Sequence, residues 1–96
     1  MTNTTLLQIF ILKSMIKGES YYPDYVFKII QNKGIETQLC LSFSVRSIHN
    51  SLKALEKMGY VKSITKAYGK LYIISDQGIA LLEKIEYINS LFLTKQ

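Results

Sequence analysis

The sequence is poor in the residues that form covalent cross-links and metal sites. Its 96 residues include one cysteine, Cys40, and one histidine, His49. A single cysteine cannot form a disulfide within the chain, which favours a reducing, intracellular setting, and we expect a cytoplasmic protein. One cysteine and one histidine are also too few for the ligand sets of structural zinc. We therefore expect no metal and no cofactor, and we interpret Cys40 as a small core residue rather than a redox sensor.

Long apolar runs are missing as well. The most apolar stretch, residues 6–16, is interrupted by Lys13, and no run approaches the roughly 18 apolar residues that a membrane span needs. This stretch has no basic segment before it and no small-residue cleavage site after it, so it does not resemble a signal peptide. We expect no membrane partner.

Patterns typical of enzymes are absent, whereas positive charge is abundant. We find no nucleophile paired with a base, no paired carboxylates and no glycine-rich phosphate loop, so we expect a protein that is not an enzyme. Twelve Lys and Arg against seven Asp and Glu give a formal net charge of +5. This excess fits a polyanionic partner such as nucleic acid, although net charge also serves solubility.

The length allows one small domain, residues 1–96, which would gain stability from burial against a second copy. A first helix is predicted from a cap at Thr4 or Thr5 to about Lys17, with Gly18 as its stop. Its apolar residues surround almost the whole circumference, and such a helix must be buried on more than one side. We therefore expect Leu6 and Phe10 to contact a partner chain.

The next segments predict a second helix, a connection and a third helix. Pro23 and Asp24 form a typical helix start, and this helix is expected to end near Lys33 with Gly34 as a left-handed exit. Residues 35–43 suit either an extended segment, such as a short β-bridge to a hairpin, or a turn with an extra hydrophobic anchor. Ser44 is predicted to cap a third helix that ends at Met58, before Gly59.

The third helix separates two kinds of side chain. Its apolar residues Val45, Ile48, Leu52 and Leu55 share one face. A second arc of about 100° carries polar side chains that suit the major groove, where Arg and Asn bond guanine and adenine edges. Near the start of the helix, hydroxyl groups could donate to phosphates. The candidate DNA-binding residues of this helix are Ser44, Arg46, Ser47, His49, Asn50, Lys53 and Lys57, with Arg46, His49 and Asn50 as base readers. A solvated polar face, and a His49 that only packs or faces solvent, are the alternatives.

A β-hairpin and a last helix follow. Residues 60–66 and 70–75 predict two strands joined by a tight turn at Gly69, with Lys62, Lys66, Tyr68 and Lys70 as candidate phosphate or minor-groove contacts. Alternatively, these lysines only keep the exposed edge of the hairpin from pairing with a strand of another chain. Residues 76–93 predict a C-terminal dimerisation helix, since four of its apolar residues lie within an arc of about 60°. These residues are Leu81, Ile85, Ile88 and Phe92.

The order of elements is that of a winged helix-turn-helix: an α+β, mostly α fold with a three-helix core, a two-stranded β-wing and the C-terminal helix. Two roles are open for the tyrosines near the start of the second helix: they line an aromatic ligand pocket, or they only pack as wall residues of the fold. These are Tyr21, Tyr22 and Tyr25. The residues identify no small-molecule effector. The leading prediction is a DNA-binding regulator, and the rival is a winged helix used for protein–protein contact in a transcription or replication complex.

Two motifs carry a resemblance to a known family. The segment Ser44-Val-Arg-Ser-Ile-His-Asn-Ser-Leu-Lys-Ala-Leu-Glu-Lys-Met-Gly-Tyr-Val61, followed by Leu71-Tyr-Ile-Ile-Ser-Asp-Gln-Gly78, resembles the PadR-like winged-helix regulators. Small regulators of archaeal viruses and plasmids look similar. The resemblance implies a homodimeric transcriptional repressor that binds a palindrome-like operator of double-stranded DNA. At the position of His49 that family carries an aromatic residue.

Overall fold

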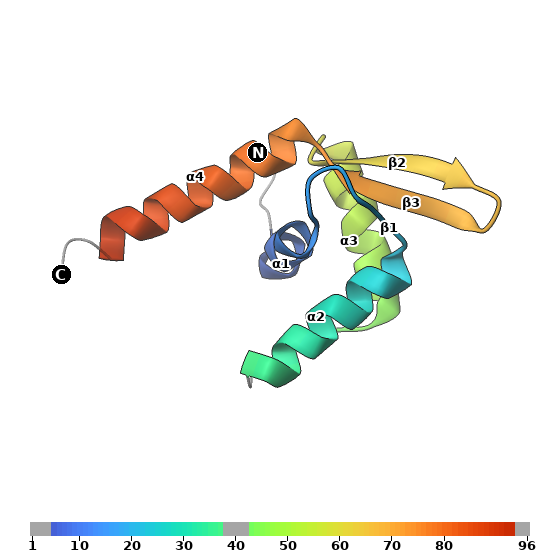
Figure 1. The fold of residues 1–96 in the computed structure, drawn as a ribbon, viewed down its shortest axis with the longest axis horizontal. Helices are drawn as coiled ribbons and strands as arrows, with labels where there is room; N and C mark the ends of the chain where they lie inside the picture. Colours follow the sequence, from blue (N-terminus) through green and yellow to red (C-terminus); the bar gives the residue numbers. More distant parts are fainter. Residues whose placement is uncertain (1–4, 38–42, 94–96) are drawn as a thin grey trace.

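The computed structural model describes residues 5–37 and 43–93, and it contains four helices and one antiparallel sheet in that part of the chain (Figure 1). Helices α1, α2 and α3 pack together beside the sheet, and α4 leads away from them. This is the predicted winged helix-turn-helix arrangement. In chain order the elements are α1 (Leu6–Ser14), β1 (Ser20–Tyr21), α2 (Pro23–Thr37), α3 (Val45–Lys57), β2 (Val61–Lys66), β3 (Gly69–Ile74) and α4 (Asp76–Leu93).

Side-chain caps explain where two of the helices begin. The Thr5 hydroxyl accepts a hydrogen bond from Gln8 N at 3.2 Å, and Thr5 N donates to Gln8 Oε1 at 3.0 Å, which forms a capping box at the start of α1. Ser44 caps α3 by accepting from Ser47 N at 3.1 Å. Each cap pairs N–H groups that the helix itself leaves without partners. Both predicted helix starts are confirmed.

Two predicted helix ends are wrong. Helix α1 ends at Ser14 rather than near Lys17, and α2 continues through Gly34 to Thr37. In the described residues, positive φ occurs at Gly18, Gly59 and Gly69, not at Gly34. Glycine permits a left-handed exit but does not require one, so the surrounding packing decided the matter. The expected extended segment 35–43 is helical up to residue 37, and its residues 38–42, with Cys40, lie outside the described part.

The sheet has three strands, whereas the sequence predicted two. Strands pair in the order β1-β3-β2, all antiparallel, with Ser20 opposite Ile73 and Val61 opposite Ile74. The hairpin β2–β3, which we call the wing, therefore has β1 along its inner edge. Strand β1 is two residues long, too short to show the alternating pattern by which strands are recognised.

The hydrophobic core lies where the three packed helices meet the sheet. Ile11, Leu12, Val26 and the α3 residues Ile48, Leu52 and Leu55 are fully buried, and the sheet contributes Tyr21, Val61, Tyr72 and Ile74. The predicted core face of α3 is therefore confirmed, except that Val45 at its start is 36% exposed. The core residues of α3 anchor the helix on one side and leave its other side outward.

Tyr21 holds the short strand β1 in place. Its ring is buried, lies opposite Tyr72 in the sheet and stacks on Tyr25 with 5.9 Å between ring centroids. Its hydroxyl accepts a hydrogen bond from Ile16 N at 2.9 Å, so it also ties the turn after α1 to the sheet. Of the two alternatives for this tyrosine, wall packing is the one that the structure shows.

We expect Tyr21→Phe to lower the free energy of unfolding by about 0.5–1.5 kcal/mol, because it removes one hydrogen bond and leaves the ring packed. Urea unfolding at fixed protein concentration measures the change. Tyr22→Phe, which alters the neighbouring and more exposed tyrosine, is the matched control and should have a smaller effect. Equal stability of the wild type and Tyr21→Phe would show that this bond adds nothing.

Candidate nucleic-acid interface

The outward side of α3 carries the polar side chains that the sequence predicted there. Arg46, His49, Asn50, Lys53 and Lys57 are all exposed, while the core residues of the same helix are fully buried. At the start of the helix the hydroxyl groups of Ser44 and Ser47 lie 3.1 Å apart. This end of the helix has a partial positive charge from its backbone N–H groups, which favours anions. The helix therefore presents both cations and hydrogen-bond donors to solvent.

An open groove of about 740 Å³ lies between the start of α2, the outer side of α3 and the tip of the wing. It brings together four of the predicted residues from two elements, His49 and Lys53 from α3 with Tyr68 and Lys70 from the wing. Tyr68 at the tip is 91% exposed. The remaining lining residues are Tyr22, Pro23, Asp24, Tyr25, Lys28, Gly69 and Tyr72.

The contribution of α2 to this groove was missed by the sequence reasoning. Lys28 is not among the residues predicted to contact DNA, and the sequence assigns Tyr22 and Tyr25 only to a ligand pocket or to wall packing. The structure places all three beside the α3 cations. The sequence feature that could have indicated this contribution is a basic residue about one turn into α2. The sequence does not show, however, which side of α2 borders α3.

Positive charge dominates the groove, with one acidic exception. Its lining includes Lys28, Lys53 and Lys70 from three different elements, and Asp24 as a carboxylate. The Asp24 Oδ1 atom lies 3.6 Å from Nε2 of His49, a contact that is an ion pair when the histidine is protonated. Both side chains are open to solvent, so the contact contributes little to the stability of the fold.

Tyr72 forms part of the groove lining and is itself buried. Burial raises the pKa of its phenol, and the nearby Glu56 carboxylate raises this pKa further. Glu56 is held in turn by Ser63, whose hydroxyl donates to Oε2 at 2.5 Å. Tyr72 therefore stays neutral at physiological pH, and the charged groups of the groove are its lysines and Asp24.

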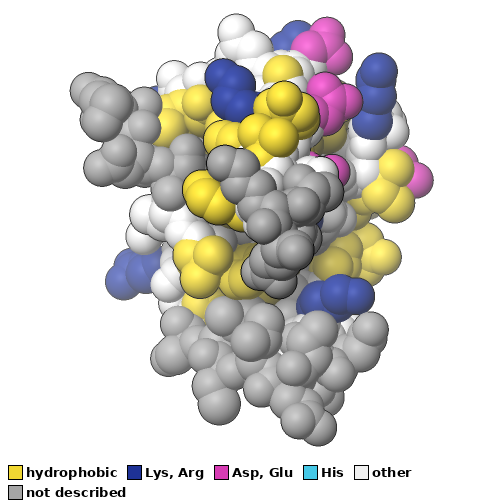
Figure 2. Space-filling view, turned by 90° about the vertical axis from the view of Figure 1, so that its left-hand side faces the viewer, with side chains coloured by type: hydrophobic (Ala, Val, Ile, Leu, Met, Phe, Trp, Pro, Cys, Tyr) yellow, Lys and Arg dark blue, Asp and Glu magenta, His cyan; other side chains and the backbone are white. Residues whose placement is uncertain are grey.

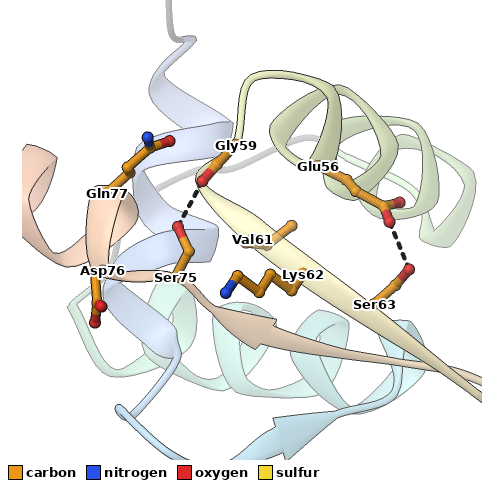
Figure 3. Close-up of a pocket in the computed structure, with 8 residues that line it drawn as sticks. All are labelled: Glu56, Gly59, Val61, Lys62, Ser63, Ser75, Asp76 and Gln77. Atoms are coloured by element: carbon orange, nitrogen blue, oxygen red, sulfur yellow. Dashed lines mark hydrogen bonds between the residues drawn. The ribbon is translucent and has the colours of Figure 1, made fainter.

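The wing lysines do not all share one location. Side chains alternate along a strand, so Lys70 lies on the same side of the wing as Tyr72, and Lys62 and Lys66 lie on the other. Lys62 borders a second hollow, next to Glu56, Asp76 and Gln77 (Figure 3). Among the described residues, seven predicted contacts do not line the groove: Ser44, Arg46, Ser47, Asn50, Lys57, Lys62 and Lys66.

The predicted dimer contacts fall into two classes. Leu6, Ile88 and Phe92 are exposed, at 64%, 45% and 71%. Phe10, Leu81 and Ile85 are half-buried within the chain. Helix α4 leads away from the other elements, and the molecule measures 51 × 29 × 26 Å (Figure 1). Figure 2, which looks toward the outer end of α4, shows neighbouring hydrophobic patches on this side.

Other kinds of site are not found in the part of the chain that the structure describes. No three or more His, Cys, Asp and Glu side chains come together there in a way that could hold a metal ion. None of the helices in residues 5–37 and 43–93 is long and apolar enough to cross a membrane.

Solved structures with the same architecture support the assignment of the fold. A PadR family transcription regulator from Clostridium difficile R20291 matches with a TM-score of 0.68 and 18% identity, over 95% of this chain and 93% of that chain. The fold is PadR-like. A transcriptional regulator from Clostridium thermocellum, Cth-833, matches with a TM-score of 0.62 and 26% identity, over 93% of this chain and 82% of that one. No protein-family model and no curated protein matches the chain.

Proposed function

We propose that this PadR-like protein is a sequence-specific, double-stranded-DNA-binding transcriptional regulator that acts as a homodimer, most simply as a repressor. The observation that carries the proposal is the groove that joins the exposed, cationic side of α3 to the tip of the wing. It is also supported by the likeness to two transcription regulators, which covers 95% and 93% of this chain and 93% and 82% of theirs.

The major groove of DNA suits α3 in size and chemistry. A helix with its side chains is about 10–12 Å across, and the major groove is about 12 Å wide. Arg46 and Asn50 lie near the start of α3, the end that usually contacts bases in this class of fold. Arg can bond guanine O6 and N7 together, and Asn can bond adenine N6 and N7. In the proposal these two residues read sequence, with His49 beside them.

The lysines that line the groove then face the sugar–phosphate backbone. With α3 in the major groove and the wing over the neighbouring minor groove, the strand between them runs past Lys28, Lys53 and Lys70. Contacts of this kind position a protein on the duplex without reading its sequence. The Asp24 carboxylate in the same groove repels phosphate, and its Oδ1 lies 3.6 Å from Nε2 of His49.

A homodimer through α4 follows from the exposed apolar side chains on that helix. Ile88 and Phe92, one turn apart in the last part of α4, are 45% and 71% exposed. Burial of such side chains against a second copy removes their apolar surface from water. Two copies would present their α3 helices to half-sites about 34–36 Å apart, the spacing of one turn of DNA.

Selection from a random duplex pool tests the proposal. We expect the protein to enrich one palindrome-like sequence, and we expect binding to weaken steeply as salt rises, because each neutralised phosphate releases counterions. Electrophoretic mobility shifts from 50 to 200 mM salt measure this dependence. Weak binding that enriches no sequence and ignores salt would contradict the proposal and favour the protein–protein contact role.

Substitution of Arg46 and Lys28 should separate base reading from backbone contact. Arg46→Ala is expected to cost about 1–3 kcal/mol on the selected sequence and to relax its base preference. Lys28→Ala should weaken all duplexes alike and lower the salt slope by about 1. Fluorescence anisotropy on selected and scrambled duplexes distinguishes the two effects.

Lys84→Ala, on α4, is the control for Lys28→Ala, because it removes the same charge at an exposed position away from the groove. It should leave the binding constant nearly unchanged. An Arg46→Ala variant with full sequence preference would reject the base-reading role of that residue.

Ile88→Glu should convert the dimer into a monomer, because a carboxylate would be buried in the apolar contact. Since Ile88 is 45% exposed in the single chain, the fold should survive. Sedimentation velocity measures the mass and circular dichroism the helix content. Asn89→Glu places the same group about 100° away around α4 and should stay dimeric. A dimeric Ile88→Glu variant would rule out this contact.

A further inference from the structure

The start of α4 is bonded directly to the end of α3. Met58 caps α3 and Gly59, with φ of 85°, turns the chain, so that Gly59 N donates to Glu56 O and Tyr60 N to Leu55 O. These two bonds form a Schellman motif, which pins the residues after a helix to its last turn. Gly59 and Tyr60 therefore move with α3.

Ser75 joins α4 to those same residues. Its hydroxyl donates to Gly59 O at 2.6 Å (Figure 3). The same hydroxyl accepts a hydrogen bond from Gly78 N at 3.1 Å. Its backbone N–H donates to Tyr60 O at 3.0 Å. Ser75 is 6% exposed, so these bonds are shielded from competing water. We call Gly59, Tyr60, Ser75 and Gly78 the α4 junction.

Gly78 shows how closely the two backbones approach. A Cβ atom at this position would lie 2.3 Å from Tyr60 O and 2.8 Å from Ile74 Cγ1. Backbone cannot turn aside as a flexible side chain can, so any side chain at residue 78 must push the start of α4 away. At Gly59, by contrast, a Cβ atom would meet the movable Gln77 Oε1 at 2.5 Å. The junction therefore fixes the direction of α4 by direct backbone contact.

A small displacement at the junction becomes large at the other end of α4. A Cβ atom at residue 78 requires a shift of about 1 Å to reach ordinary contact distance from the carbonyl oxygen. Residue 78 lies about 5 Å along the helix from Ser75, so this shift tilts α4 by roughly 10°. The helix is about 27 Å long, and its outer end would then move by roughly 5 Å.

We propose that the α4 junction determines the half-site spacing that the dimer accepts on DNA. This inference rests on the proposed function, because it requires two DNA-binding domains joined through α4. The rise of DNA is about 3.4 Å per base pair, so a displacement of roughly 5 Å exceeds one base-pair step. Ser75 and Gly78 are thus positioning residues, which act on specificity through α4.

Binding to duplexes of graded spacing tests the inference. The set contains a single half-site and paired half-sites whose separation differs from the selected one by up to three base pairs in either direction. We expect Gly78→Ala to bind the single half-site within about twofold of the wild type. On paired sites its optimum should move by one or two base pairs, with at least a tenfold loss at the wild-type spacing.

Gly18→Ala is the matched control. Gly18 has positive φ, at 86°, whereas Gly78 does not, so alanine is strained by its backbone conformation at residue 18, but nothing lies within 4 Å of the added Cβ atom. This variant should lose stability and keep the wild-type spacing optimum. Ser75→Ala is the second test variant, since it removes the two hydroxyl bonds without adding an atom. It should broaden the optimum so that neighbouring spacings bind within about threefold of the best one.

The outcomes separate the two proposals. A folded, dimeric Gly78→Ala variant with the wild-type optimum overturns the inference while the proposed function stands. If Gly78→Ala does not fold, a Ser75→Ala variant that retains the sharp wild-type optimum overturns it equally. A wild-type protein that binds no duplex overturns the proposed function, and the inference with it.

Discussion

The burial of one side of α3 is the interaction on which the rest of the structure depends. Ile48, Leu52 and Leu55 are fully buried against α1, α2 and the sheet, and they fix both the position and the rotation of the helix. Because the period of a helix is 3.6 residues, fixing these three also fixes the direction of the residues between them. Arg46, His49 and Asn50 are exposed for this reason. A DNA-reading surface needs such rigidity, since hydrogen bonds to base edges tolerate little displacement.

Around this helix the domain supplies cations from elements that are distant in sequence. Lys28 comes from α2, Lys53 from α3 and Lys70 from the wing, and all three line one groove. Tyr72 contributes no charge, since burial and Glu56 raise the pKa of its phenol. Asp24 is the acidic member, held beside His49. The groove therefore carries an excess of positive charge, which suits the phosphates of the proposed DNA partner, with one carboxylate among the lysines.

The junction at Ser75 and Gly78 gives α4 a defined direction from the same rigid unit. Ser75 N and Gly78 contact the Tyr60 carbonyl backbone to backbone, and the short, buried Ser75 hydroxyl links Gly59 O to Gly78 N. Such contacts transmit orientation more firmly than long, flexible side chains would. In a dimer joined through α4, the geometry of DNA recognition is then divided between two places. The outer side of α3 would contact the DNA bases, and the start of α4 would set the distance between the two half-sites that a dimer binds.

Local signals in the sequence determined most of the fold. Caps, periodicity and turns act over a few residues, so they can be recognised in the sequence. They predicted the Ser44 cap, the buried face of α3, the two long strands and the bounds of α4. The exposed polar face of α3 was predictable for the same reason. Only tertiary structure decided three other features. Strand β1 forms where Tyr21 lies opposite Tyr72, and α2 continues beyond Gly34. Lys28 lies in the groove, whereas Lys62 lies on the other side of the wing. These features depend on contacts between residues far apart in the chain, and no spacing within one segment encodes which faces of two elements will meet.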